Sequence, residues 1–216
     1  MSKSFLLGVG TAAVAAGVGL WHQNRLSIAA DVPLELKRAP PESAPICPWR
    51  EPEADLKRLF PHATRYEART CILSGLRLEL AERLGRPPTG DENALRLYQA
   101  YRDDTPLGFV MTRRVKGDHG AIELVLAVDA QQSVSSLHLQ RWREPEAVAQ
   151  ALQDPAWLAA FSGKNAGSPC RIGEDLPAVR PAARASAQAI AEGVHSLLVL
   201  LALAQGPDSL STPSHH

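Results

Sequence analysis

Residues 181–194, PAARASAQAIAEGV, hold the side chains whose types and spacing best suggest ligand chemistry. The pattern predicts a helix that starts after a loop, with Arg184 in its first turn and the small residues Ala183 and Ser186 beside it. Free backbone N–H groups at a helix N-terminus attract anions, and small side chains let an anion approach the backbone. An arginine there can add a bidentate hydrogen bond to a phosphate. We expect either an anion site at this helix start or a solvated arginine.

Catalysis would need a nucleophile beside a base, or carboxylates clustered in a pocket. Asp118 and His119 stand in a glycine-containing turn, and Glu174 and Asp175 stand in a loop. The sequence places no partner for either pair. Turn chemistry and solvated charge explain both, so we expect no catalytic site.

The three cysteines, Cys47, Cys71 and Cys170, contain no CxxC spacing, so the sequence predicts no zinc or iron–sulfur site. Arg171 follows Cys170 and could lower its thiol pKa. A disulfide between Cys71 and Cys170 is equally conceivable, as are three idle cysteines. The histidine pair at 215–216 belongs to a polar tail.

Composition limits the class of partner. The 216 residues suffice for one domain with additions, and 45% of them are hydrophobic, which supports a core. Lys and Arg together number 23, as do Asp and Glu, so the formal net charge is zero. Phosphate backbones require a basic surface, and base stacking requires aromatics, which make up only 5% here. We therefore expect no nucleic-acid partner.

Alternating apolar residues predict an antiparallel meander of four strands, over residues 92–104, 107–115, 121–129 and 133–142. The segment 71–80 is ambiguous. Leu76, Leu78 and Leu80 alternate as in a strand, and a helical turn then closes at Gly85.

Helices are predicted over residues 51–60, 144–152, 154–163 and 183–204. The end of the last one, 197–204, is apolar on all sides but too short to cross a bilayer, so it belongs to the core or docks on a partner. The expected fold class is α+β: an antiparallel sheet meander flanked by helices, with a long C-terminal helix and an N-terminal transmembrane anchor.

Four regions follow from this pattern. Residues 5–21 carry no charge and would span about 25 Å as a helix, so 1–25 is a transmembrane anchor or a cleaved signal. We favour the anchor, which would leave the rest on the extracytoplasmic (periplasmic) side. Residues 26–51 are a proline-rich linker, 52–206 the folded domain, and 207–216 a tail.

Several phrases stand in an order that resembles a known family. They are LKRLFPHATRYEA (56–68), the block 106–145 with its KGDHGAI turn, and WLAAFSGKN (157–165). In this order they resemble the extracytoplasmic FMN-binding domain of Rnf and sodium-pumping NADH:quinone reductase flavin subunits. The resemblance covers about residues 53–204 and implies membrane electron transfer.

That family begins its last helix with S/T-G-A-T-x-S/T-S-x-A-V, whose threonine carries FMN through a phosphodiester bond. The resemblance places Arg184 at that threonine, Ser186 at a hydroxyl position, and Ala183 in the S-G-A stretch. Arginine has no hydroxyl to esterify, so we expect no covalent FMN. The loop that would face the flavin ring keeps Pro145 but lacks the family's two glycines.

Two functions follow from the resemblance. The first is a flavin-free accessory or structural subunit of a membrane redox or photosynthetic complex, held in the membrane by residues 5–21 and bound to other subunits. The alternative is an electron carrier with non-covalent FMN. In that case Arg184, Ser186, Ala183, Pro145 and Lys164 are the candidate cofactor residues, with Arg180 adding charge.

Overall fold

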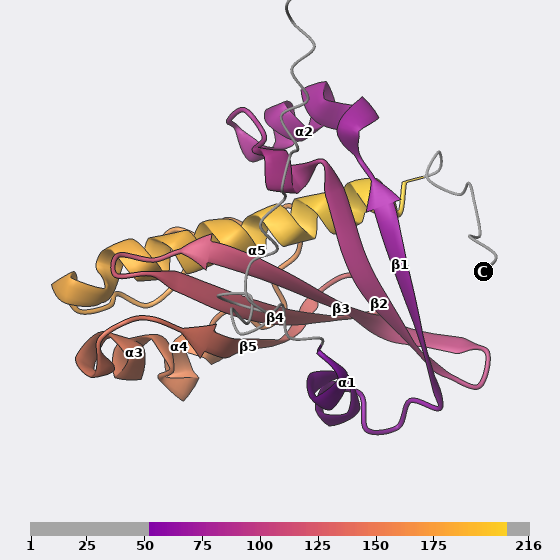
Figure 1. The fold of residues 1–216 in the computed structure, drawn as a ribbon, viewed down its shortest axis with the longest axis horizontal. Helices are drawn as coiled ribbons and strands as arrows, with labels where there is room; N and C mark the ends of the chain where they lie inside the picture. The colour runs from indigo at the N-terminus through magenta and orange to yellow at the C-terminus, as the bar shows by residue number, and fades with distance from the viewer. Residues whose placement is uncertain (1–51, 207–216) are drawn as a thin grey trace, which may run out of the picture. The chain divides into compact units, whose positions relative to one another are not determined.

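The computed structural model describes residues 52–206, and the predicted anchor or signal, the linker and the tail lie outside the described residues. Five antiparallel strands form one sheet in chain order (Figure 1). They are β1 (Arg65–Ile72), β2 (Ala94–Arg102), β3 (Thr105–Lys116), β4 (Ala121–Asp129) and β5 (Val134–Trp142). The last four confirm the predicted meander. The sequence did not predict β1, because it is an edge strand that stays largely exposed and shows little apolar alternation.

The strand alternative for residues 71–80 is wrong. β1 ends at Ile72, and a 3₁₀ turn, η1 (Ser74–Leu76), leads into helix α2 (Arg77–Leu84). Leu80 is fully buried while Leu78 is exposed, because two residues along a helix lie on roughly opposite sides. The predicted end at Gly85 is confirmed, since this glycine caps α2 in the left-handed conformation with φ of +66°.

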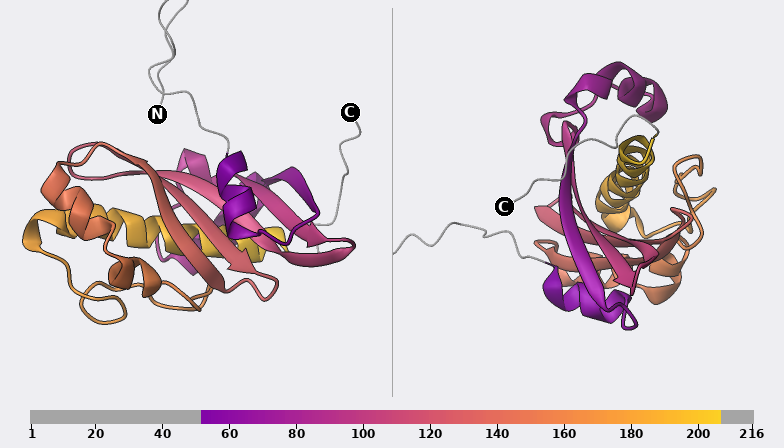
Figure 2. Two further views of the ribbon diagram at one scale, coloured as in Figure 1. Left: turned by 90° about the horizontal axis from the view of Figure 1, so that it is seen from below. Right: turned by 90° about the vertical axis from the view of Figure 1, so that its right-hand side faces the viewer.

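Helix α5 (Arg184–Ala204) lies against one face of the sheet and forms the main core with it (Figure 2). Its apolar end is core, since all of residues 197–204 except the half-buried Ala202 are buried. Within residues 52–206, Pro181–Ala204 alone is long and apolar enough to cross a membrane, but most of it is buried inside the domain. We therefore read it as the core helix of the domain.

The opposite face of the sheet carries helix α1 (Glu53–Leu59). Leu56 packs there in a second apolar cluster with Tyr98, Val110 and Val125. The hydroxyl of Tyr66 donates to the carbonyl of Phe60 at 2.9 Å, just after α1, and also lies 3.2 Å from the carbonyl of Leu56. Helices thus cover parts of both faces, which confirms the α+β class.

Two short helices follow the sheet. They are α3 (Glu146–Leu152) and α4 (Pro155–Ala159), each within a predicted helical range, although α4 ends earlier than expected. Asp154 caps α4 as predicted, since its Oδ1 accepts from the N–H groups of Ala156 (2.8 Å) and Trp157 (3.2 Å). A 3₁₀ turn, η3 (Pro181–Ala183), leads into α5, and another, η2 (Gly90–Glu92), precedes β2.

Candidate functional site

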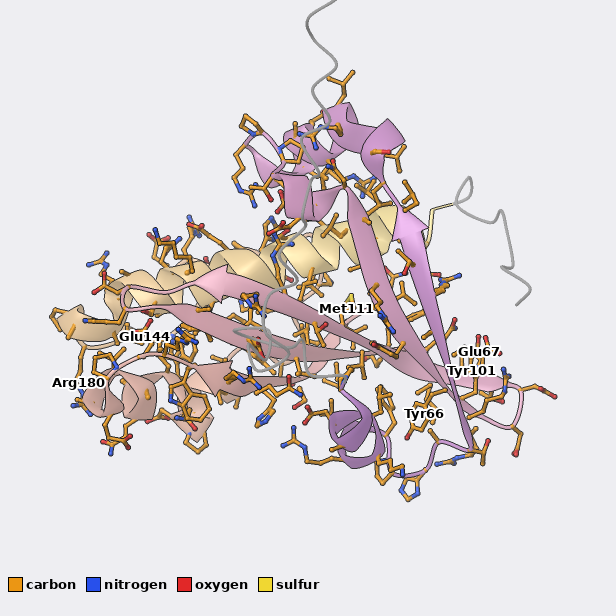
Figure 3. The ribbon with its side chains drawn as sticks, in the orientation of Figure 1. Tyr66, Glu67, Tyr101, Met111, Glu144 and Arg180 are labelled. Atoms are coloured by element: carbon orange, nitrogen blue, oxygen red, sulfur yellow. The ribbon has the colours of Figure 1, made fainter. Side chains whose placement is uncertain are left out.

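The start of α5 meets two loops at one end of the sheet. These are the β3–β4 turn, residues 117–120, and the segment 143–145 that follows β5. The turn closes when the Gly117 N–H donates to the Gly120 carbonyl at 2.8 Å, and the Arg143 N–H donates to the Ala121 carbonyl at 3.1 Å. Figure 3 shows Glu144 and Arg180 at this same end of the molecule. The predicted ligand residues on α5 therefore face chain segments some 40 to 70 positions earlier.

Glu144 is the central side chain of this region. Its carboxylate is completely buried, and its Oε1 accepts the backbone N–H of His119 at 3.3 Å. Its Oε2 lies 3.0 Å from Nδ1 of His119, whose ring is about half exposed. A buried carboxylate needs donors, so His119 donates through Nδ1 and thereby holds the acid in place.

Ser186 and Glu144 approach Gly117 together. A Cβ at Gly117 would lie 2.1 Å from Oε1 of Glu144 and 3.0 Å from Oγ of Ser186, so only glycine fits. Ser186 is fully buried, and its Oγ accepts the backbone N–H of Asp118 at 2.9 Å. The hydroxyl predicted to face a ligand is thus a structural tie between α5 and the β3–β4 turn.

The structure brings four of the five predicted residues to this end. Ala183 is buried, Arg184 is exposed, and Pro145 precedes α3, which packs on η3. In the described part of the chain, the Arg184 guanidinium has no hydrogen bond or ion pair. Arg180 is exposed as well. The helix start therefore presents a cation to solvent and a carboxylate to the interior.

Lys164 lies apart from the other four. Its carbonyl accepts the N–H of Val134, the first residue of β5, and its Nζ donates to the Pro169 carbonyl at 3.0 Å. The segment 143–145 follows the far end of the same nine-residue strand, about 30 Å away at the usual rise of a strand. Lys164 therefore does not contribute charge at the start of α5.

A second buried carboxylate, Glu92, was not singled out by the sequence. Its Oε1 accepts from Arg86 (2.7 Å), Arg113 (3.0 Å) and the Ser196 hydroxyl (2.6 Å). Its Oε2 accepts the Thr89 N–H at 2.7 Å. Burial raises the pKa of Glu92, but the hydrogen bonds from Arg86, Ser196 and Thr89 and the charge of Arg113 outweigh it and lower the pKa to about 2.

Glu92 is fully buried and both of its oxygens accept hydrogen bonds from protein groups, so this cluster ties η2, β3 and α5 together. One sequence signal could have marked it. Thr89 and Glu92 have the T-x-x-E spacing of a capping box, and both of its hydrogen bonds form here.

The remaining candidates are Cys170 and the charged residues beside it. Burial raises the pKa of the Cys170 thiol, which is opposite to the lowering that Arg171 could have caused. Arg171 instead pairs with Asp175 (2.8 Å) and Glu174 (3.0 Å). Cys71 and Cys170 are free thiols, and Cys47 lies outside the described residues.

No known family model matches the chain, and no curated protein is similar to it.

Proposed function

We propose that this chain is a membrane-anchored, extracytoplasmic domain of FMN-binding type that carries no flavin and serves as an accessory or structural subunit of a membrane electron-transfer complex. The observation that supports this proposal is the buried carboxylate of Glu144, held beside Ser186, two residues along the chain from Arg184, where the resemblance would put the flavin ester.

A phosphate at the start of α5 would bring a second negative charge to the end of the domain that already holds the buried carboxylate of Glu144, and like charges repel strongly where water is excluded. The positive end of α5 already has a negative group of the protein's own beside it. Ser186 already uses its oxygen in a hydrogen bond to the β3–β4 turn. A flavin would have to displace contacts that hold this end of the domain together.

The test is purification of the full chain from its native membranes in mild detergent, followed by absorbance and identification of co-purifying subunits. We expect redox subunits to co-purify in fixed ratio and no flavin band in the amount that one FMN per chain would give. Stoichiometric flavin on this chain, or purification without any partner, would contradict the proposal.

A non-covalent FMN carrier is the second candidate, and exposed Arg184 favours it. Its guanidinium stands at the N-terminus of a 21-residue helix, where a phosphate could accept two hydrogen bonds. Titration of FMN against the full chain separates the two candidates by flavin fluorescence. The flavin-free proposal expects no saturable binding.

If FMN does bind, Arg184→Ala decides how. If the chain is an FMN carrier, this variant should lose FMN binding. The control variant Arg102→Ala, which changes an exposed arginine on β2, should bind FMN as the wild type does. Equal affinity of all three proteins would remove Arg184 as the phosphate ligand.

A further inference from the structure

Exposed large apolar side chains gather in one short stretch. Among residues 52–206 they are Ile72, Leu76 and Leu78, with exposed fractions of 71%, 36% and 90%. They fall within seven consecutive residues, at the end of β1, in η1 and at the start of α2 (Figure 1). Single exposed leucines are ordinary on protein surfaces, but a group of three in one stretch, with no others in the described part of the chain, is typical of a contact surface.

The core does not need these side chains. Helix α2 packs on α5 through its other side, where Leu80 is fully buried. Leu78 lies about 200° around the helix from Leu80, so a polar residue there would cost no packing. Gly75, between Ile72 and Leu76, has nothing within 4 Å of a built Cβ, so the surface around it is open.

The size and composition of the stretch argue against a protein partner. A stable protein–protein interface buries about 800 Å² on each side, which three aliphatic side chains cannot supply. Its energetic centres are usually Trp, Tyr and Arg, with leucine under-represented. A second copy of the chain meets the same objection.

Contact with a lipid surface does not require so large a buried area, because the predicted anchor already holds the chain at the membrane. The uncharged apolar run 5–21 is separated from α1 by 31 residues, 22–52, which extend to about 100 Å at most. A tether of that length keeps the domain at high effective concentration beside the bilayer, so a weak contact suffices. This step depends on the anchor in the proposed function.

We propose that Ile72, Leu76 and Leu78 form a lipid-contact surface that enters the boundary between headgroups and acyl chains and lays the domain on the membrane. Part of the nearby charge is paired, since Arg83 forms an ion pair with Glu79. Arg77 keeps its positive charge, because it donates to neutral groups, the side-chain oxygen of Asn93 and a backbone carbonyl. The three apolar side chains supply the contact in this proposal, so it does not require anionic lipid.

The experiment uses the full chain, with its three cysteines replaced by serine, reconstituted into phosphatidylcholine vesicles. A nitroxide is attached through Gly75→Cys, where open space accepts it, and in a second sample through Asp104→Cys in the exposed β2–β3 turn. Collision with a water-soluble nickel chelate and with oxygen reports water or lipid around each label.

We expect the label at 75 to lose most of its access to nickel and to gain access to oxygen on reconstitution, while the label at 104 keeps its values. The double change Ile72→Ser and Leu78→Ser should restore nickel access at 75 without changing the unfolding midpoint. A label at 75 that stays as water-accessible as the label at 104 overturns the inference, and so does protection that needs no vesicles but rises with protein concentration.

Flotation of the same vesicles separates this inference from the proposed function. Protein that floats with a water-accessible label at 75 retains its anchor and lacks the lipid contact. Protein that does not float has no anchor, which contradicts both. The flavin and subunit results of the purification are independent of either outcome.

Discussion

Glu92 is a buried charged residue that joins several elements of the fold. Its carboxylate is fully buried, and it neutralises one of two arginines that surround it. The side chain of Arg113 is only 14% exposed, so it has little water to replace a lost partner. Removing one member of such a cluster leaves charge in a region that cannot solvate it.

Glu92→Gln should therefore lower the free energy of unfolding by about 3–5 kcal/mol, although it keeps the shape of the side chain. Urea unfolding of the variant and the wild type measures the difference. Glu82→Gln, an exposed change on α2, should stay within about 0.5 kcal/mol of the wild type. A loss as small for Glu92→Gln would mean that the arginines find other partners.

At this scale the sequence could predict part of the candidate site. Arg184, Ser186 and Ala183 were placed at a helix start from local pattern alone, and the structure has them there. The burial of Glu144 could not be predicted, because it depends on two segments that lie beside Glu144 in the fold, the 117–120 turn and the start of α5. Both segments are tens of residues away from Glu144 in the sequence. Local pattern carries no information about such contacts.

Among the elements, α5 and β3 are fitted to each other at one glycine. A Cβ on Gly193 would lie 2.5 Å from Cγ1 of Val115 and 3.1 Å from Cδ1 of Leu124. Both contacts are in the core, and a β-branched valine has little freedom to turn away. The close approach of helix and sheet therefore depends on the missing side chain.

Gly193→Ala should destabilise the protein by about 1–2 kcal/mol, because overpacking outweighs the gain of about 1 kcal/mol in helix propensity. Thermal unfolding gives the measurement. Gly75→Ala, which meets nothing within 4 Å, is the matched control and should change stability by less than about 0.5 kcal/mol. A stabilised Gly193→Ala would show that Val115 moves freely.

The elements with strong periodicity were predictable, and those without it were not. β4 carries alternating Ile122, Leu124, Leu126 and Val128, and its predicted bounds match the structure. β1 and α2 were not predicted from the sequence, because an edge strand and a two-turn helix packed on one side bury few residues and so show little apolar periodicity. Leu76, Leu78 and Leu80 alternate as in a strand, although the fold buries only Leu80 of these three.

For the whole molecule, buried titratable groups make stability depend on pH. Burial lowers the pKa of His138 and His195 below the ordinary 6.5, and positive charge from Arg58 and Arg86, respectively, adds to this effect. The unfolded chain therefore takes up protons first as the pH falls below about 6.5, which weakens folding. Glu92 affects stability at lower pH, because its pKa of 4.5 in the unfolded chain exceeds its pKa of about 2 in the folded protein.

We expect the free energy of unfolding to fall from pH 7 to pH 5 and to fall again below pH 4.5. Urea unfolding across this range tests both windows. The pair His138→Asn and His195→Gln should flatten the first window and leave the second, while Glu92→Gln should do the reverse. One smooth decline unaffected by either change would mean that other groups control acid stability.

The free edge of β1 has a consequence for solubility. No strand among the described residues pairs with its outer side, so a row of backbone groups stands open to other chains. Arg65, Glu67 and Arg69 recur at every second position along it. A strand from another chain that paired with this edge would have to dehydrate the charged side chains of these three residues. They therefore disfavour edge-to-edge aggregation. Replacing all three with valine should produce assemblies whose size, measured by light scattering, grows with protein concentration. The wild-type chain should show no such growth at the same concentrations.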